Sequence, residues 1–201
     1  MTKLGSAKIL GGIGALLSLF TFAPWVGPVL GLAGLVFVFV AIKYVADETK
    51  DNSIFSNYLM NFILTIIAVG AVIGIMVAAF GLSGGFSWIS SIQGRNFTDF
   101  NSFWASFGTL IGGCILAFII AWILLIIGTL YLRKSFNSIG DRTNVGLFKT
   151  TGLVYFIGAI TLIIVVGLFI LIIANILEIA SFFSLPDNLP AATEPPKPAT
   201  H

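Results

Sequence analysis

The chain has 201 residues, of which 58% are hydrophobic and 9% are charged, and its mean hydropathy is +1.07. This composition lies far outside that of soluble globular proteins and indicates a polytopic helical membrane protein that contacts the lipid bilayer. The formal net charge is only +2 and no basic cluster carries interleaved aromatic residues, which argues against a nucleic acid partner, and the single cysteine excludes an internal disulfide.

The chain begins with two apolar segments separated by a short turn. We expect a first membrane helix over residues 6–23 and a second over residues 29–45. The two prolines within residues 24–28 remove backbone donors and reset the chain direction between these helices. The end of the first segment loosely imitates a signal-peptide cleavage site, but the proline directly after it disfavours cleavage. We therefore interpret the segment as a membrane helix.

A charged loop over residues 47–51 follows, and Asn52 and Ser53 offer a cap for a third helix over residues 54–80. The carboxylates of this loop lack the spacing and the glycine of an EF-hand. We therefore interpret it as a solvated loop and not as a cation site. The longest loop, residues 81–101, comes next.

The fourth helix is expected over residues 103–132, inside a stretch from 100 to 132 that has no ionisable side chain. At about 1.5 Å of rise per residue this stretch exceeds the hydrocarbon core of about 30 Å, so its aromatic start should lie in the membrane interface. A fifth helix is expected over residues 147–177. Residues 186–201 are too polar and proline-rich to pack, which predicts a disordered extracytoplasmic tail after a single all-α transmembrane bundle over residues 1–185.

Five spans place the N-terminus inside and the C-terminus outside the cell membrane. Basic residues gather on the cytoplasmic side of membrane proteins. With five spans, eight of the ten basic residues lie on that side, namely Lys3, Lys8, Lys43, Lys50, Arg133, Lys134, Arg142 and Lys149. The alternative is four spans and a re-entrant first segment, which would put Lys3 and Lys8 opposite Lys43. The charge pattern favours five.

The sequence offers little chemistry for catalysis. No predicted span has an ionisable side chain near its centre, and no catalytic triad, pair of catalytic carboxylates, phosphate loop or metal-ligand spacing is present. These observations predict a protein that is not an enzyme and that has no cofactor and no metal site. Glu178 and Asn175 lie together near the end of the fifth predicted helix, where we interpret Glu178 as an interfacial carboxylate that reaches water; an ion vestibule is the alternative.

Small residues recur every four positions in several predicted helices. Such a pattern lets two membrane helices approach closely, either within one subunit or between subunits. The candidates for helix packing are Gly11, Gly31, Gly70, Gly74, Gly108 and Gly112.

The longest loop contains Asn96, in the sequon Asn96-Phe97-Thr98, on the side that the predicted topology places outside. Asn96 is therefore a candidate for glycosylation. The aromatic residues of the same loop predict a short amphipathic segment along the outer interface or over a partner subunit.

Several short segments resemble a family of small archaeal integral membrane proteins that is known only as a domain of unknown function. The resemblance rests on residues Ile9–Gly14, Ala41–Tyr44, Ile54–Tyr58, Tyr131–Phe136 and Gly146–Gly152, with Ser181–Ser184 near the end of the bundle. It implies a membrane-embedded helical protein of archaeal type and supplies no activity and no catalytic residues.

Two functions of different classes follow. The first is a structural or accessory subunit, in a homo-oligomer or fitted to other subunits of a larger membrane complex. The second is a channel or facilitator for a small neutral or apolar solute, lined by polar side chains such as Asn61, Thr65, Thr109, Thr129 and Thr161. Clustering of these side chains around a hydrated cavity would favour transport, whereas scattered bonds to neighbouring backbone carbonyls would favour the subunit.

Overall fold

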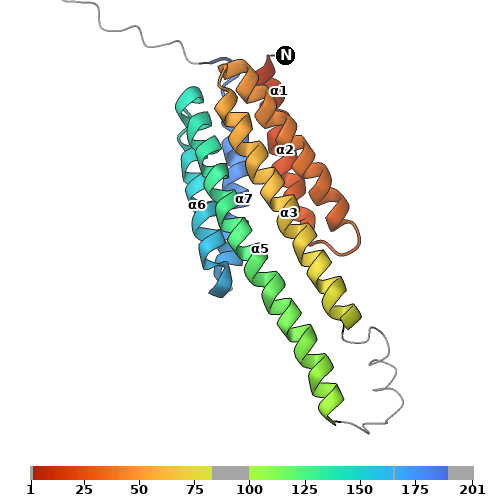
Figure 1. Cartoon of the computed structure of the whole chain (residues 1–201). Coiled ribbons are helices and arrows are strands. Elements are labelled where there is room, and N and C mark those ends of the chain that lie inside the picture. The colour runs from red at the N-terminus through yellow and green to blue at the C-terminus, as the bar shows by residue number, and fades with distance from the viewer. Residues whose placement is uncertain (1, 83–99, 165, 190–201) are drawn as a thin grey trace, which may run out of the picture. The chain divides into compact units, whose positions relative to one another are not determined.

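The computed structural model describes residues 2–82, 100–164 and 166–189. Within these ranges all regular structure is helical (Figure 1), which confirms the predicted all-α class. In chain order the elements are α1 Lys3–Leu19, the 3-10 helix η1 Phe20–Phe22, α2 Gly27–Thr49, α3 Asn52–Leu82, α5 Phe100–Thr143, α6 Leu147–Thr161, the 3-10 helix η2 Leu162–Ile164 and α7 Val166–Phe183.

Five of the described helical segments are long and apolar enough to cross a membrane, which confirms the predicted number. They are Val29–Thr49, Asn52–Gly81, Phe107–Thr143, Leu147–Ile164 and Val166–Phe183. The set differs from the predicted one because it excludes α1, whose 17 residues rise only about 25 Å, and because it divides the predicted fifth helix in two. The chain is therefore a multi-pass membrane protein in contact with lipid.

The chain divides into two compact units, which we call the core unit (Met1–Leu59 with Tyr131–His201) and the hairpin unit (Met60–Leu130). The core unit contains α1, α2, α6 and α7 together with the start of α3 and the end of α5. The hairpin unit contains the rest of α3 and α5.

The core unit is centred on Phe148 of α6. Its ring packs edge to face against Phe136 of α5, with centroids 5.5 Å apart, and against Phe182 of α7, with centroids 5.3 Å apart. All three rings are fully buried, and aromatic pairs of this geometry contribute beyond their buried area. The rings thereby join α5, α6 and α7 around one apolar core, which also includes Leu4, Ile42, Ile54 and Ile139.

In the hairpin unit the two helices meet along a line of small residues. Ala68, Ala79 and Ala117 are almost fully buried, and a Cβ atom added to Gly113 would overlap the Cβ atom of Ala79. Cys114 Sγ lies 3.5 Å from Met76 Sδ on the same pair of helices. Short side chains along this line let the two helix backbones approach each other closely.

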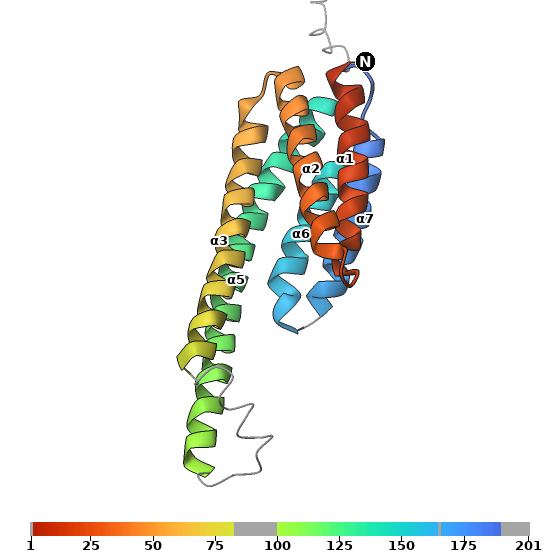
Figure 2. The same cartoon turned by 90° about the vertical axis from the view of Figure 1, so that its right-hand side faces the viewer.

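The helix predicted over residues 147–177 is wrong as a single element. The chain forms α6, turns at η2 and runs back as α7, so the two helices lie side by side in both views (Figures 1 and 2). A Cβ atom at Gly167 would overlap the backbone of Leu162, so glycine is what allows this close reversal. No proline or charged residue marks the turn in the sequence.

The predicted placement of the two termini on opposite sides of the membrane is also wrong. Thr2 Oγ1 donates a hydrogen bond of 2.6 Å to the Asp187 carbonyl, and Lys8 Nζ lies 3.9 Å from the Asp187 carboxylate. Residues this close cannot lie on opposite faces of a hydrocarbon core about 30 Å thick. Thr2 and Asp187 therefore lie at the same end of the core unit.

Ion pairs of the core unit lie where α2 and α5 end and where α3 and α6 begin. Figure 2 shows these helix ends on the same side as the N-terminus. Ion pairs join Lys43 to Asp47 at 2.9 Å and Arg142 to Asp51 at 3.0 Å, and Lys149 also pairs with Asp141. All eight basic residues that we predict to be cytoplasmic belong to this unit. The positive-inside rule predicts the cytoplasmic side for a charged end of this kind.

Side-chain caps explain where two of the helices begin. The Thr2 hydroxyl accepts a hydrogen bond from the Gly5 amide and caps α1. Lys50 adopts a left-handed conformation with φ of 54° and ends α2. Asp51 then accepts bonds from the amide and hydroxyl of Ser53, so the cap of α3 is Asp51, one residue before the predicted pair.

Candidate functional site

The glycines predicted for helix packing fall into two groups, and those of the core unit are covered by their own chain. Gly11 lies directly under the ring of Phe182, and Gly31 lies against Thr21. The tightest crossing joins α1 and α2, where a Cβ atom on Gly14 would lie 2.8 Å from both Phe37 Cβ and the Val38 amide nitrogen. The core unit therefore uses its glycines to bring its own helices together.

The predicted glycines of the hairpin unit are open. No described atom lies within 4 Å of the position that a Cβ atom would take at Gly70, Gly74, Gly108 or Gly112. Gly70 and Ala79 are nine residues apart, so they point about 180° away from each other on α3. Gly70 and Gly74 therefore lie on the face of α3 opposite to the one that contacts α5.

Three of the polar side chains that we named for a solute path bond to carbonyl groups of their own helices. Thr65 donates to the Asn61 carbonyl at 2.9 Å, Thr129 to the Ile126 carbonyl at 3.0 Å and Thr161 to the Ile157 carbonyl at 2.8 Å. Each of these bonds stays within one helix. They satisfy the hydroxyl groups of these three threonines in an apolar setting.

The environment of Glu178 differs from the predicted one. It is only 7% exposed, and among the described residues it is the one charged side chain that is buried. The Tyr155 hydroxyl donates a hydrogen bond of 2.6 Å to Glu178 Oε2. The interpretation of Glu178 as an interfacial carboxylate that reaches water is therefore wrong, because the reversal at η2 packs α7 against α6 and encloses this side chain.

Further polar groups surround this carboxylate. Tyr58 of α3 is 6% exposed and lies close enough to interact electrostatically with Glu178. The Asn175 side chain is within hydrogen-bonding range of the Tyr155 hydroxyl, but its Oδ1 atom is buried with no partner among the described residues. We call Tyr58, Tyr155, Asn175 and Glu178 the buried polar cluster. It brings together side chains from α3, α6 and α7.

A second polar layer lies next to this cluster, towards the charged end. The hydroxyl groups of Thr151 and Ser181 are 2.9 Å apart, and both side chains are fully buried. Ser181 is three residues after Glu178 on α7, and Thr151 is four residues before Tyr155 on α6. Both layers therefore lie on the facing sides of the two helices.

The sequence carried one signal for this cluster that our interpretation missed. Ala174, Glu178 and Ser181 recur at helical spacing, and all three are buried, on an otherwise bulky helix. A face of small residues on such a helix indicates that it packs against protein. A carboxylate on that face is therefore expected in the interior.

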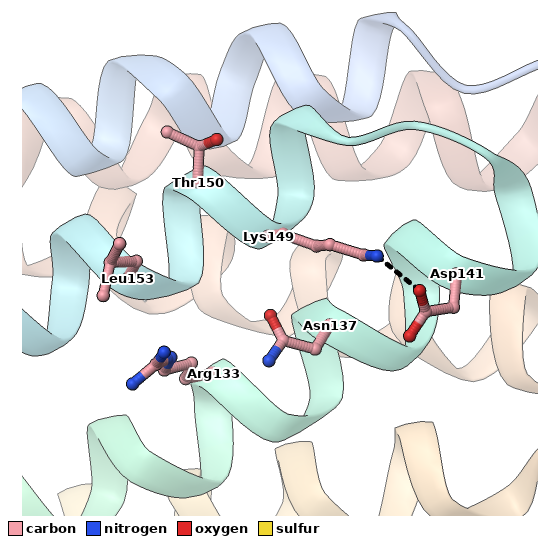
Figure 3. A pocket seen from close by; sticks show the side chains of 6 residues that line it. All are labelled: Arg133, Asn137, Asp141, Lys149, Thr150 and Leu153. Atoms are coloured by element: carbon pink, nitrogen blue, oxygen red, sulfur yellow. Dashed lines mark ion pairs between the residues drawn. The ribbon is translucent and has the colours of Figure 1, made fainter.

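A shallow pocket lies near the charged end of the core unit, between α5 and α6 (Figure 3). Its volume is about 360 Å³, and its lining residues are Arg133, Asn137, Asp141, Lys149, Thr150 and Leu153. Asp141 neutralises Lys149 through their ion pair, while the Arg133 guanidinium lies over the Phe156 ring, 5.8 Å from its centroid. The pocket therefore carries two positive side chains, Arg133 and Lys149, against one negative side chain, Asp141.

The glycosylation candidate and most of the predicted tail lie in parts of the chain that the structure does not describe. Asn96 lies outside the described residues, as does most of the loop predicted over residues 81–101. The predicted tail lies outside them from residue 190 onward. In the parts that the structure describes, no three His, Cys, Asp or Glu side chains come together in a way that could hold a metal ion.

Comparison with known proteins places the chain in a family. Residues 30–176 match the model of a family described as protein of unknown function (DUF996). An uncharacterized protein, MJ1644, from the archaeon Methanocaldococcus jannaschii is 36% identical over 187 residues, which cover 93% of this chain and 96% of that protein. No solved structure matches the chain. The predicted resemblance is thereby confirmed, and the chain belongs to the DUF996 family of proteins of unknown function.

Proposed function

We propose that this protein is a non-enzymatic structural subunit of the cell membrane that assembles with further copies of itself through the hairpin unit. The observation that carries the proposal is the open space at Gly70, Gly74, Gly108 and Gly112. Membrane helices associate through close backbone approach at small residues. The core unit uses its glycines in this way, and the hairpin unit leaves the same feature without an occupant from its own chain.

A second copy of the chain fits these two faces, one on α3 and one on α5, because each face is complementary to itself. Gly70 and Gly74 form a shallow groove on α3, and Val77, seven residues after Gly70, adds an exposed ridge on the same side. On α5, Ile115 is exposed and lies seven residues after Gly108, so it forms a ridge on the same side of that helix as Gly108. Groove and ridge on one surface allow a symmetric contact in which each copy inserts its ridge into the groove of the other.

The low burial of the hairpin unit supports the same proposal. Only 11% of the residues are buried in the membrane window of α3 and 6% in that of α5, against 28 to 33% in the other three segments. The hydroxyl groups of Thr65 and Thr129 bond to carbonyls of their own helices, which favours a subunit over a channel.

Disulfide cross-linking in native membranes tests the proposal. In a Cys114→Ser background, we expect Val77→Cys and Ile115→Cys each to give a covalent dimer on mild oxidation. Ile173→Cys on α7 is the matched control, because all three positions are more than half exposed but Ile173 belongs to the core unit. Equal cross-linking at Ile173 would indicate random collision and contradict the proposal.

Light scattering of the purified protein in mild detergent gives an independent test. We expect an oligomer for the natural sequence, and a weakening of at least about tenfold in its dissociation constant for Gly74→Ile or Gly112→Ile, because the new side chain fills the groove. Gly146→Ile is the control, since Gly146 also has open space around it but lies outside the hairpin. A monomer for the natural sequence, both in detergent and in membranes, would overturn the proposal.

A further inference from the structure

The buried polar cluster of the core unit lacks a positive charge. Glu178 is enclosed by apolar helices, and none of the ion pairs in the described parts of the chain includes it. Tyr155 supplies one hydrogen bond to the carboxylate, which leaves its negative charge without compensation. An isolated carboxylate is costly in such a setting, and intramembrane carboxylates therefore mark ion or proton sites.

The cluster also has an excess of oxygen acceptors. Asn175 Oδ1 is buried and has no partner, although nearly all buried polar atoms in proteins have one. Together with the carboxylate of Glu178 and the hydroxyl of Tyr155, it gives an oxygen-only set on two packed helices. Tyr58 of α3 is a further buried side chain within electrostatic range of Glu178. Oxygen-only sets suit hard cations, and a single carboxylate balances one positive charge.

We propose that Glu178, Asn175 and Tyr155, with Tyr58 beside them, form a binding site for a monovalent alkali cation such as Na⁺ inside the membrane bundle. The site lies near the charged end of the core unit. Glu178 lies five residues before the end of α7, about 8 Å below that end. The hydroxyl groups of Thr151 and Ser181 lie in the layer between the site and the charged end and supply oxygen atoms at this depth.

The test is thermal unfolding of the full-length protein in detergent at pH 8, with NaCl or KCl exchanged for N-methylglucamine chloride at constant ionic strength. A ligand that binds only the folded state raises the melting temperature with its concentration. We expect the natural sequence to melt higher in the alkali salt, by about 5 °C at a hundredfold excess over the dissociation constant. Glu178→Gln should abolish this dependence, and Tyr155→Phe should reduce it.

Glu48→Gln is the matched control, because it removes a carboxylate at the charged end of α2 and should leave the cation dependence unchanged. A cation-dependent shift that persists in Glu178→Gln would overturn the proposal. So would a melting temperature of the natural sequence that responds to pH but not to Na⁺ or K⁺, since a proton would then neutralise Glu178. Should Glu178→Gln fail to fold, binding of radioactive ²²Na⁺ decides: about one ion per chain supports the site, and no bound ion overturns it.

Discussion

The two units of this protein contain the same small-residue pattern and use it in different ways. In the core unit, Gly11 and Gly14 each lie against another helix of the chain, and Phe182 is fully buried over Gly11. In the hairpin unit, Gly74 and Gly112 have open space, and most large side chains are exposed. The comparison shows that glycine spacing predicts a surface where helices can approach, but not which helix approaches it.

The most direct test of this difference between the units is to replace one glycine by isoleucine in each of them. Gly14→Ile should prevent formation of the core unit, because the new side chain meets backbone atoms of α2 that cannot move aside. Gly74→Ile should leave the folding of the monomer unchanged, since no described atom lies nearby. Yield of folded protein and thermal unfolding in detergent measure both effects. Equal loss of folded protein in the two variants would contradict the distinction between the units.

A second pair of substitutions compares buried and exposed aromatic rings. Phe182→Ala should lower the free energy of unfolding by about 3 to 5 kcal/mol, because Phe182 is fully buried against Phe148 and over Gly11. Phe118→Ala in the hairpin unit should cost less than about 0.5 kcal/mol, since that side chain is 45% exposed. Chemical denaturation in a constant detergent background measures both. Similar costs would mean that another molecule covers Phe118 under these conditions.

Much of this fold could be predicted from hydrophobic segments and their boundaries. The predicted helices 29–45, 54–80 and 103–132 lie inside α2, α3 and α5, because charged or proline-containing segments bound the first two and an unbroken apolar run defines the third. The basic residues predicted to be cytoplasmic also share one unit. Placing a charge in lipid is costly, so membrane segments lack charged residues. They can therefore be recognised from composition alone.

The reversal between α6 and α7 could not be predicted in the same way. Residues Thr161–Gly167 are apolar apart from one threonine, so no polar residue marks the turn. The only signals were the length of the apolar run and Gly167, whose close contact with Leu162 becomes visible only in the folded chain. Because this reversal was not predicted, the C-terminus was predicted on the wrong side. Glu178 was also predicted at the opposite end of a single helix from Tyr155.

Removing a hydroxyl group should give a smaller difference in stability between the two units. Ser135 of α5 donates a buried hydrogen bond of 2.8 Å to the Ile54 carbonyl on α3, and both residues belong to the core unit. Ser135→Ala should lower the free energy of unfolding by about 1 kcal/mol. Thr65→Val should have almost no effect, because Thr65 bonds only to a carbonyl of its own helix. A larger effect at Thr65 would indicate that its hydroxyl takes part in a contact between copies.

The smallest effect concerns charge, which the core unit contains and the described part of the hairpin unit lacks. Residues 60–82 and 100–130 include no Asp, Glu, Lys, Arg or His, so self-association through them should not change between pH 3 and pH 7. In the core unit, the hydrogen bonds from Ser53 and then Arg142 hold the pKa of Asp51 below its ordinary value of 3.8. Because the folded state lowers this pKa, the stabilisation is present above the ordinary value and is lost as the pH falls through the folded value.

Asp51→Asn should therefore destabilise the protein at neutral pH by only a few tenths of a kcal/mol, as for other ion pairs with an exposed partner. The difference from the natural sequence should shrink as the pH is lowered below 3.8, because the natural carboxylate then becomes protonated as well. Unfolding and light scattering measured on the same samples separate the two units. A dimer that dissociates over this pH range while the core unit stays folded would show that charge contributes to the contact between copies, and would refute an association based on apolar close packing alone.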